Sequence, residues 1–200
     1  MYSSALGSYF GGSGWLLTSN DVVTAGHCLY NEMLFGGDSW ATYIKIIPSY
    51  SEANPNGAYG SLYSYLELDS IEIGGGWIDG GIRSDDWAVM SLDGNYPASA
   101  GHYTPVVAGE IDGWARIEGY NSDDSLQQDL RNIGGPIVGI GIFGQAEGIM
   151  SFEGQVHNGM SGGPCMESGQ YVMGIAKGTG IHGEILKIDD WLCNKLLSYQ

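Results

Sequence analysis

Short apolar runs and segments of alternating polarity occupy most of the chain, and both patterns are typical of β-strands. Residues 43–47 (YIKII) and 62–73 (LYSYLELDSIEI) alternate with a period of two and are rich in aromatic and β-branched side chains. Three shorter apolar runs predict buried strands at 14–18 (GWLLT), 22–25 (VVTA) and 87–92 (WAVMSL). Clusters of glycine and aspartate between these segments predict turns.

The second half of the chain follows a segment rich in turn-forming residues, 93–105 (DGNYPASAGHYTP), which we interpret as a linker. Further strands are predicted at 113–120, 136–143, 148–152, 171–176 and 184–188. No sequence repeat relates the two halves. We therefore predict an all-β protein with an N-terminal β domain at 1–98 and a C-terminal β domain at 99–200.

The last residues have a different, helical pattern. Apolar residues at 192–193 and 196–197 are one helical turn apart, so they form a stripe on one face. Asp189 and Asp190 suit the positive N-terminal end of a helix, and Lys195 suits its last turns. A short amphipathic helix at about 189–199 is predicted to dock on a barrel.

Composition and charge support an all-β protein and exclude some partners. Glycine accounts for 34 of the 200 residues, against a typical share of about 7%, which fits many tight turns. The net charge of −16 should repel nucleic acids and anionic membranes. It is most simply explained by solubility, and we expect a monomer that binds neither nucleic acid nor membrane.

The cysteines do not form a disulfide framework. There are three, Cys28, Cys165 and Cys193, at wide spacings, so at most one disulfide could form and we expect buried free thiols. The chain has no C-x-x-C pair for a zinc site. The first residues show no secretory signal, and no apolar run reaches the length of about 18 residues that a membrane span needs.

Three short motifs carry side chains suited to acyl transfer. The TAGHC motif places His27 at the end of a buried strand, and histidine exchanges protons near neutral pH. The GMSGGP motif flanks Ser161 with glycines, where consecutive N–H groups can bind an oxyanion. The DDWAVM motif places Asp86 before a buried strand, where a carboxylate needs a partner such as a histidine N–H. Each motif alone has an ordinary alternative: a structural histidine, a glycine turn or a surface acid.

The three motifs together are far more specific. Their chain order, His27 then Asp86 then Ser161, differs from that of subtilisins and α/β-hydrolases. With the segment GSGWLL at 12–17 and the C-terminal helix, they resemble the trypsin/chymotrypsin-like serine peptidases over most of the chain. The resemblance implies two six-stranded antiparallel β-barrels with the active site in the cleft between them. It also implies a serine endopeptidase that acts on protein or peptide substrates.

The resemblance assigns a role to each motif residue. Ser161 would attack the scissile carbonyl, His27 would accept and return the proton, and Asp86 would orient His27. The backbone N–H groups of Gly159 and Ser161 would bind the oxyanion. An acyl-enzyme on Ser161 would then be hydrolysed by water.

Two departures from animal-type members of the family are visible. Where those enzymes carry the cysteine that pairs with the one after the catalytic histidine, this chain has Gly12, so Cys28 lacks that partner. Met160 replaces the aspartate that receives a new N-terminal amine, so activation through that ion pair is not available. Both departures resemble bacterial and viral branches, including the glutamyl-endopeptidase group. The family favours a secreted bacterial enzyme, whereas free thiols and the absence of a visible signal would suit an internal one.

The same resemblance implies a substrate pocket. Its residues are Gln155, Val156, Ala176, Lys177 and Thr179. Without an acid at Gln155, cleavage after Lys or Arg is not predicted. Lys177 or His182 could meet an acidic substrate side chain, although a lysine more commonly points to solvent. The set favours a mainly apolar or amide-accepting pocket.

Other interpretations stay open at this point. The main alternative is a non-catalytic binding module on the same fold, and an esterase-like hydrolase of another fold fits the residue order less well. The remaining histidines show no metal-ligand spacing, and His157 could line the pocket. Loop acids such as Asp79 or Asp123 and Asp124 could bind calcium, but acidic clusters are usually only solvated. We predict no obligatory metal or cofactor.

Overall fold

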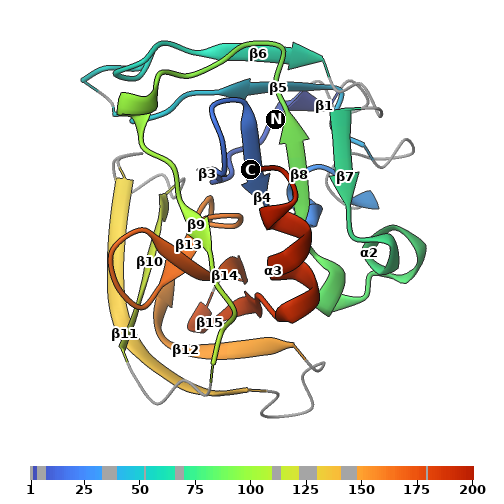
Figure 1. The fold of residues 1–200 in the computed structure, drawn as a ribbon, viewed down its shortest axis with the longest axis vertical. Helices are drawn as coiled ribbons and strands as arrows, with labels where there is room; N and C mark the ends of the chain where they lie inside the picture. Colours follow the sequence, from blue (N-terminus) through green and yellow to red (C-terminus); the bar gives the residue numbers. More distant parts are fainter. Residues whose placement is uncertain are drawn as a thin grey trace.

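The computed structural model describes residues 2–3, 8–32, 40–51, 53–65, 70–109, 114–121, 130–140, 148–178 and 180–200. Strands dominate both halves of the chain, with one longer helix at the C-terminus. In Figure 1 the N-terminal elements, blue to green, occupy the upper part and the C-terminal strands, yellow to red, the lower part. No helix among the described residues is long and apolar enough to cross a membrane.

The N-terminal half contributes two four-stranded sheets, both antiparallel. One has the order β2-β1-β5-β6, formed by Ser8–Tyr9, Tyr2–Ser3, Tyr43–Ile46 and Leu62–Tyr65. The other has the order β3-β4-β8-β7, formed by Trp15–Leu16, Asp21–Thr24, Ala88–Ser91 and Ile71–Ile73. Strand β4 is buried along its whole length, including Asp21, and it overlaps the apolar run 22–25 that was predicted as a buried strand; its partner β8 shares the same core.

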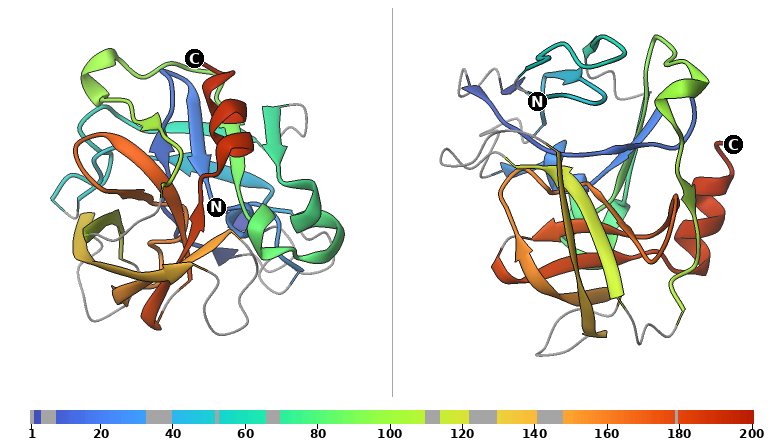
Figure 2. Two further views of the ribbon diagram at one scale, coloured as in Figure 1. Left: turned by 60° about the horizontal axis from the view of Figure 1, so that its bottom comes forward. Right: turned by 90° about the vertical axis from the view of Figure 1, so that its left-hand side faces the viewer.

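The C-terminal half forms a closed antiparallel barrel. Its strands, in neighbour order, are β10 (Trp114–Tyr120), β11 (Leu130–Ile140), β12 (Ile149–Val156), β15 (Gly180–Lys187), β14 (Tyr171–Gly178) and β13 (Pro164–Met166). Pairing of β13 with β10 closes the ring, and β9 (Thr104–Pro105) adds to β14 in parallel. Figure 2 shows this barrel packed against the N-terminal sheets. The predicted all-β, two-barrel fold is confirmed, with six strands in the C-terminal ring; the described strands of the N-terminal half are arranged in two four-stranded sheets. The domain boundary at 98/99 stays a prediction.

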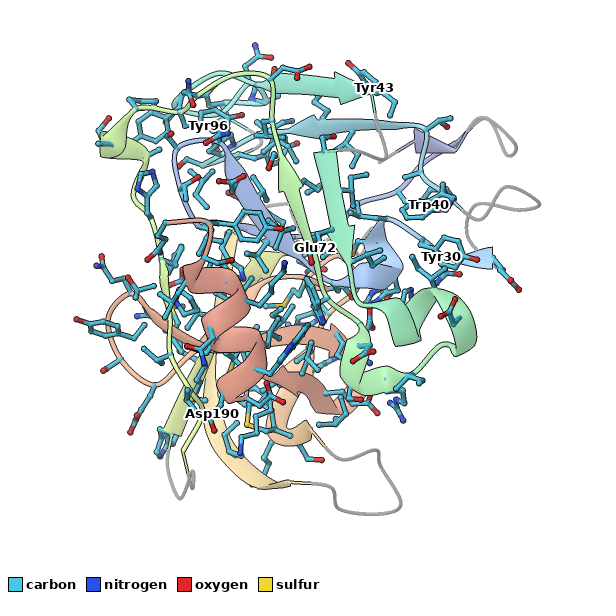
Figure 3. All side chains as sticks on the ribbon, turned by 45° about the vertical axis from the view of Figure 1, so that its right-hand side comes forward. Tyr30, Trp40, Tyr43, Glu72, Tyr96 and Asp190 are labelled. Carbon is cyan, nitrogen blue, oxygen red and sulfur yellow. The ribbon has the colours of Figure 1, made fainter. Side chains whose placement is uncertain are left out.

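The C-terminal helix α3 (Asp190–Leu197) lies close to where it was predicted. The Asp189 side chain caps it by accepting a hydrogen bond from the Leu192 N–H at 2.8 Å. Figure 3 shows Asp190 at the start of α3 and Glu72 on strand β7 beside its other end. Lys195 forms an ion pair of 2.7 Å with Glu72, so this helix is tied to the N-terminal half.

One apolar cluster joins the two halves. It contains residues from β3 and β4, from four strands of the C-terminal barrel, and from α3; its largest members include Trp15, Trp87, Ile175, Leu186 and Leu196. Because each of these side chains is almost fully buried, the halves share a single core at this point. A shared core of this kind fixes the strand ends that carry the candidate site.

Some boundaries differ from the prediction. The segment 62–73 was predicted as one strand, but it contributes β6 to one sheet and β7 to the other, with residues 66–69 outside the described part. The glycine clusters after β7 were predicted to form turns, but residues Gly75–Gly80 form the six-residue helix α2. Strand β11 begins at Leu130, earlier than predicted, and residues 141–143 lie outside the described part. A periodicity argument misses such extensions because glycine-rich strands carry little pattern.

Candidate active site

His27 and Asp86 meet where the N-terminal half faces the C-terminal barrel. His27 lies in a single turn of 3-10 helix, η1 (Gly26–Cys28), directly after β4, and Asp86 precedes β8. Since β4 and β8 are paired with Thr24 opposite Ala88, the two segments emerge side by side. The Asp86 carboxylate accepts two hydrogen bonds from the histidine, one from Nδ1 at 2.8 Å and one from its backbone N–H at 2.7 Å.

Burial and charge set the proton affinities of this pair. The Asp86 side chain is 1% exposed and that of His27 is 16% exposed. Burial disfavours a positive charge on His27, but the Asp86 carboxylate favours it, and the balance holds the pKa of His27 above its ordinary value of 6.5. Burial also opposes the charge of Asp86, yet the His27 hydrogen bonds and the nearby Lys177 hold the pKa of Asp86 below its usual value. The carboxylate is therefore ionised at neutral pH and can orient the imidazole through Nδ1.

Ser161 lies in a tight double turn between β12 and β13. The N–H of Met160 donates to the His157 carbonyl, and the N–H of Gly163 donates to the Met160 carbonyl. Gly159 has a φ of 89°, a left-handed conformation that a residue with a Cβ rarely adopts. Within the described part of the chain, the N–H groups of Gly159 and Ser161 donate no hydrogen bond to the protein. Two N–H donors are thus free beside the serine.

The backbone of Ser161 is held against the His27 segment, although its hydroxyl has another partner. Its carbonyl accepts hydrogen bonds from the Ser13 N–H at 2.8 Å and from the Cys28 thiol at 3.7 Å. The Ser161 hydroxyl donates to the carbonyl of Lys177 at 3.2 Å. No hydrogen bond joins Ser161 to the His27 imidazole in the described conformation. Such contacts are often long or misaligned in a site without substrate.

Ser13 is a site residue that the sequence did not single out. It is 7% exposed, and its hydroxyl donates to the Gly159 carbonyl at 2.7 Å while accepting from the Tyr120 N–H at 2.8 Å. Together with the bond from its own N–H to Ser161, these contacts fasten the serine turn to the N-terminal half. The only sequence signal was its place among glycines in the segment before β3.

Replacing Ser13 with alanine should loosen this turn. The change leaves the Gly159 carbonyl and the Tyr120 N–H without their buried partner, and each unsatisfied group costs about 1–3 kcal/mol. We expect the free energy of unfolding, measured in urea, to fall by about 2 kcal/mol or more. Ser19→Ala is the control, because among the described residues the Ser19 hydroxyl bonds Asn95 alone, near the surface. Equal losses from the two variants would contradict the anchoring role of Ser13.

Lys177, a predicted pocket residue, lies against Asp86 instead. Its side chain is 5% exposed, and its ammonium lies 3.2 Å from Asp86 Oδ2. The expectation that this lysine points to solvent is therefore wrong. Burial lowers the pKa of Lys177, while the Asp86 charge and hydrogen bond oppose that shift. A lysine at the end of an apolar strand carries no sequence signal for such a contact.

The shape of the molecule is that of a known class of proteases. A solved structure of a Glu endopeptidase superposes with a TM-score of 0.78, at 20% sequence identity over 96% of this chain and 86% of that one. Protease Anisep from Arthrobacter nicotinovorans gives a TM-score of 0.75 at 19% identity, covering 93% of this chain and 86% of the other. The chain has the two-barrel fold of chymotrypsin-like serine proteases. A thermostable serine protease, AL20, from an extremophilic microorganism matches as well, with a TM-score of 0.76 at 16% identity over 99% of this chain and 93% of that one.

Comparison of the sequence alone gives fewer matches than comparison of the chymotrypsin-like fold. No family model matches the chain. An extracellular metalloprotease from Bacillus subtilis (strain 168) is 30% identical over 97 residues, which is 48% of this chain and 28% of that protein's length. Among the described residues of this chain, no group of three or more His, Cys, Asp or Glu side chains is placed to hold a metal ion. Asp123 and Asp124, the loop acids considered for calcium, lie outside the described part.

The predicted pocket residues occupy different environments in the chymotrypsin-like fold. Val156 and Ala176 are 2% and 0% exposed and belong to one apolar cluster of the C-terminal barrel. Gln155 is exposed on β12, and His157 is half-buried just before the serine turn. Thr179 and the side chain of His182 lie outside the described part. The described residues bring Val156 and Ala176 together but turn Lys177 towards Asp86.

Proposed function

We propose that this protein is a serine endopeptidase in which Ser161, His27 and Asp86 act as a catalytic triad. The observation that carries the proposal is the doubly hydrogen-bonded His27–Asp86 pair, with the carbonyl of Ser161 bonded to the neighbouring Cys28. A carboxylate that fixes the Nδ1 proton leaves Nε2 to act as the base. The chymotrypsin-like fold and the protease names of its structural neighbours support the same reaction.

The proposed reaction is acyl transfer in two steps. Nε2 of His27 removes the proton as Ser161 Oγ attacks the peptide carbonyl carbon, and the resulting oxyanion accepts hydrogen bonds from the Gly159 and Ser161 N–H groups. The C–N bond then breaks as His27 protonates the leaving amine, which leaves an ester on Ser161. Water, deprotonated by His27, hydrolyses the ester and releases the acid. The Ser161 hydroxyl must first leave the Lys177 carbonyl and turn to His27.

A fluorophosphonate probe tests this proposal directly, because it reacts only with an activated serine. We expect the native protein to be labelled and to hydrolyse members of a mixed-sequence fluorogenic peptide library. Ser161→Ala should abolish labelling and lower kcat by about 10⁴- to 10⁶-fold. Ser168→Ala is the matched control, since Ser168 is exposed in the turn before β14, and it should label like the parent.

A non-catalytic binding module is the alternative. The hydrogen bond from the Ser161 hydroxyl to the Lys177 carbonyl favours it, because that bond holds the hydroxyl away from a base. A folded native protein that takes up no label and cleaves no peptide would establish this alternative. Labelling that survives Ser161→Ala would instead overturn the assignment of the nucleophile.

For specificity, we propose a subsite backed by the buried apolar side chains of Val156 and Ala176, with the exposed Gln155 amide at its edge. No acid occupies these three positions, so a basic substrate side chain gains no ion pair there. One structural neighbour is named a Glu endopeptidase, but Lys177, a candidate cation for an acidic side chain, is already paired with Asp86. Profiling with the peptide library therefore should show a preference for apolar or amide side chains over basic ones.

A further inference from the structure

The ammonium of Lys177 is buried among groups of the candidate triad. It lies 3.2 Å from Asp86 Oδ2, the oxygen that also accepts from His27 Nδ1. It donates a hydrogen bond of 2.7 Å to the Arg83 carbonyl, and it lies 5.6 Å from the centroid of the Trp77 ring. A buried ammonium needs such partners to remain charged. Because the Lys177 ammonium contacts Asp86 Oδ2, its charge acts directly on the candidate triad.

The backbone of the same residue contacts the nucleophile. The Lys177 carbonyl accepts the hydrogen bond of the Ser161 hydroxyl at 3.2 Å. One residue of β14 therefore reaches the acid with its side chain and the serine with its backbone. The neighbouring Ala176 holds this strand against the serine turn, with its N–H donating to Gly163 and its carbonyl accepting from Gly162.

We propose that Lys177 is a positioning residue of the active site, whose ammonium holds the Asp86 carboxylate in place beside His27 and offsets part of its negative charge. The inference rests on the proposed serine endopeptidase function. The carboxylate oxygen Oδ2 receives two donors, Nδ1 of His27 and Nζ of Lys177, from opposite halves of the molecule. Since a carboxylate oxygen has two lone pairs, both donors can be satisfied at once, and the carboxylate is held from both sides.

The charge of Lys177 should also act on His27. A positive charge next to Asp86 disfavours a second positive charge on the imidazole, so it makes His27 release its proton at lower pH than Asp86 alone would allow. The surrounding charges largely cancel, because Arg83 is paired with Glu184 on β15. Within the part of the chain that the structure describes, the titratable and charged groups that face this ammonium and His27 are Asp86, Arg83, Glu184 and Cys28.

The Trp77 ring lies near both the Lys177 ammonium and the His27 imidazole. It packs edge-on against the His27 imidazole with centroids 6.2 Å apart, and its Nε1 donates to the Tyr30 carbonyl at 2.9 Å. Helix α2, which carries Trp77, is held to the Asp86 segment by a hydrogen bond of 2.9 Å from the Gly76 N–H to Asp85. Because the Lys177 side chain is 5% exposed and that of His27 is 16% exposed, the charge of the ammonium acts on the imidazole with less screening than at the surface.

The test is to remove the charge and follow His27. Lys177→Gln keeps an N–H donor for the Arg83 carbonyl but carries no charge, whereas Lys177→Arg keeps the charge. We expect the Gln variant to raise the pKa of His27 by about one unit, read by NMR of the imidazole in a Ser161→Ala background. The acidic limb of kcat/KM should move to higher pH by the same amount, because His27 must lose its proton to act as a base. Lys177→Arg should leave both the pKa of His27 and the acidic limb of kcat/KM unchanged.

A matched lysine separates this effect from general loss of charge. Lys195→Gln removes a cation from α3 that pairs with Glu72 and lies 31% exposed, and it should leave the His27 titration unchanged. An unchanged His27 titration in Lys177→Gln, or a shift equal to that of Lys195→Gln, would overturn the proposal. Because the NMR measurement needs no turnover, it decides the role of Lys177 even if the fluorophosphonate test fails for the native protein.

Discussion

Asp86→Asn should lower kcat/KM by about 10⁴-fold. The three described groups that contact this carboxylate are all donors: the His27 N–H, its Nδ1–H and the Lys177 ammonium. An amide offers one acceptor oxygen and one NH₂ group, so at least one donor would then face another donor. The imidazole would be held in the wrong tautomer or would turn away from Ser161. The ammonium would also lose its counter-charge in a buried place.

Asp21→Asn is the matched control for this change. Asp21 is also a buried aspartate of the N-terminal half, but its carboxylate accepts from the hydroxyls of Ser91 and Thr18, each at 2.6 Å. A hydroxyl can either donate or accept, so an amide can be accommodated there. We expect near-normal kcat/KM from Asp21→Asn. Activity is measured on the best peptide of the library, under conditions in which both variants are fully folded. Comparable kcat/KM in the two variants would rule out an orienting role for Asp86.

The contact between His27 and Asp86 could be predicted because each residue follows or precedes a buried strand. A histidine at a strand end and a carboxylate before a buried strand are both costly to bury without a partner. The chain order of the motifs then suggested that they pair, and the structure places them 2.8 Å apart. The turn around Ser161 was predictable in the same way, because its glycines permit a left-handed backbone at Gly159.

The contacts of Ser13 and Lys177 could not be predicted, because they depend on how the two halves are docked. Ser13 bonds Gly159 and Tyr120, which are more than 100 residues away in the sequence. The Lys177 ammonium reaches Asp86 because β14 is hydrogen-bonded to the serine turn through Ala176. A local pattern reports on the partner of a side chain only when the two are neighbours in sequence or on one strand pair.

Gly162→Ala should strongly lower the free energy of unfolding, through a steric clash where the two halves meet. Gly162 has a φ of 89°, and a Cβ added there would overlap the Ser13 carbonyl oxygen and the Thr24 hydroxyl and lie 3.0 Å from the Ala25 nitrogen. These atoms cannot move freely, since the Thr24 hydroxyl donates to that same Ser13 carbonyl at 2.7 Å. Left-handed strain costs about 1–3 kcal/mol, and overpacking of this kind adds about as much again. That loss is a large share of a typical stability of about 5–15 kcal/mol.

Gly169→Ala separates steric overlap from backbone strain. Gly169 also has a left-handed backbone, with a φ of 60°, but no described atom lies within 4 Å of an added Cβ. It should therefore lose only the glycine preference, about 1 kcal/mol, and keep fluorophosphonate labelling. Urea unfolding of both variants measures the two costs, and labelling reports whether the Ser161 turn survives. If Gly162→Ala were no less stable than Gly169→Ala, the serine turn would not pack on the Ser13–Thr24 segment as described. The turn that carries the proposed nucleophile would then need another anchor on the N-terminal half.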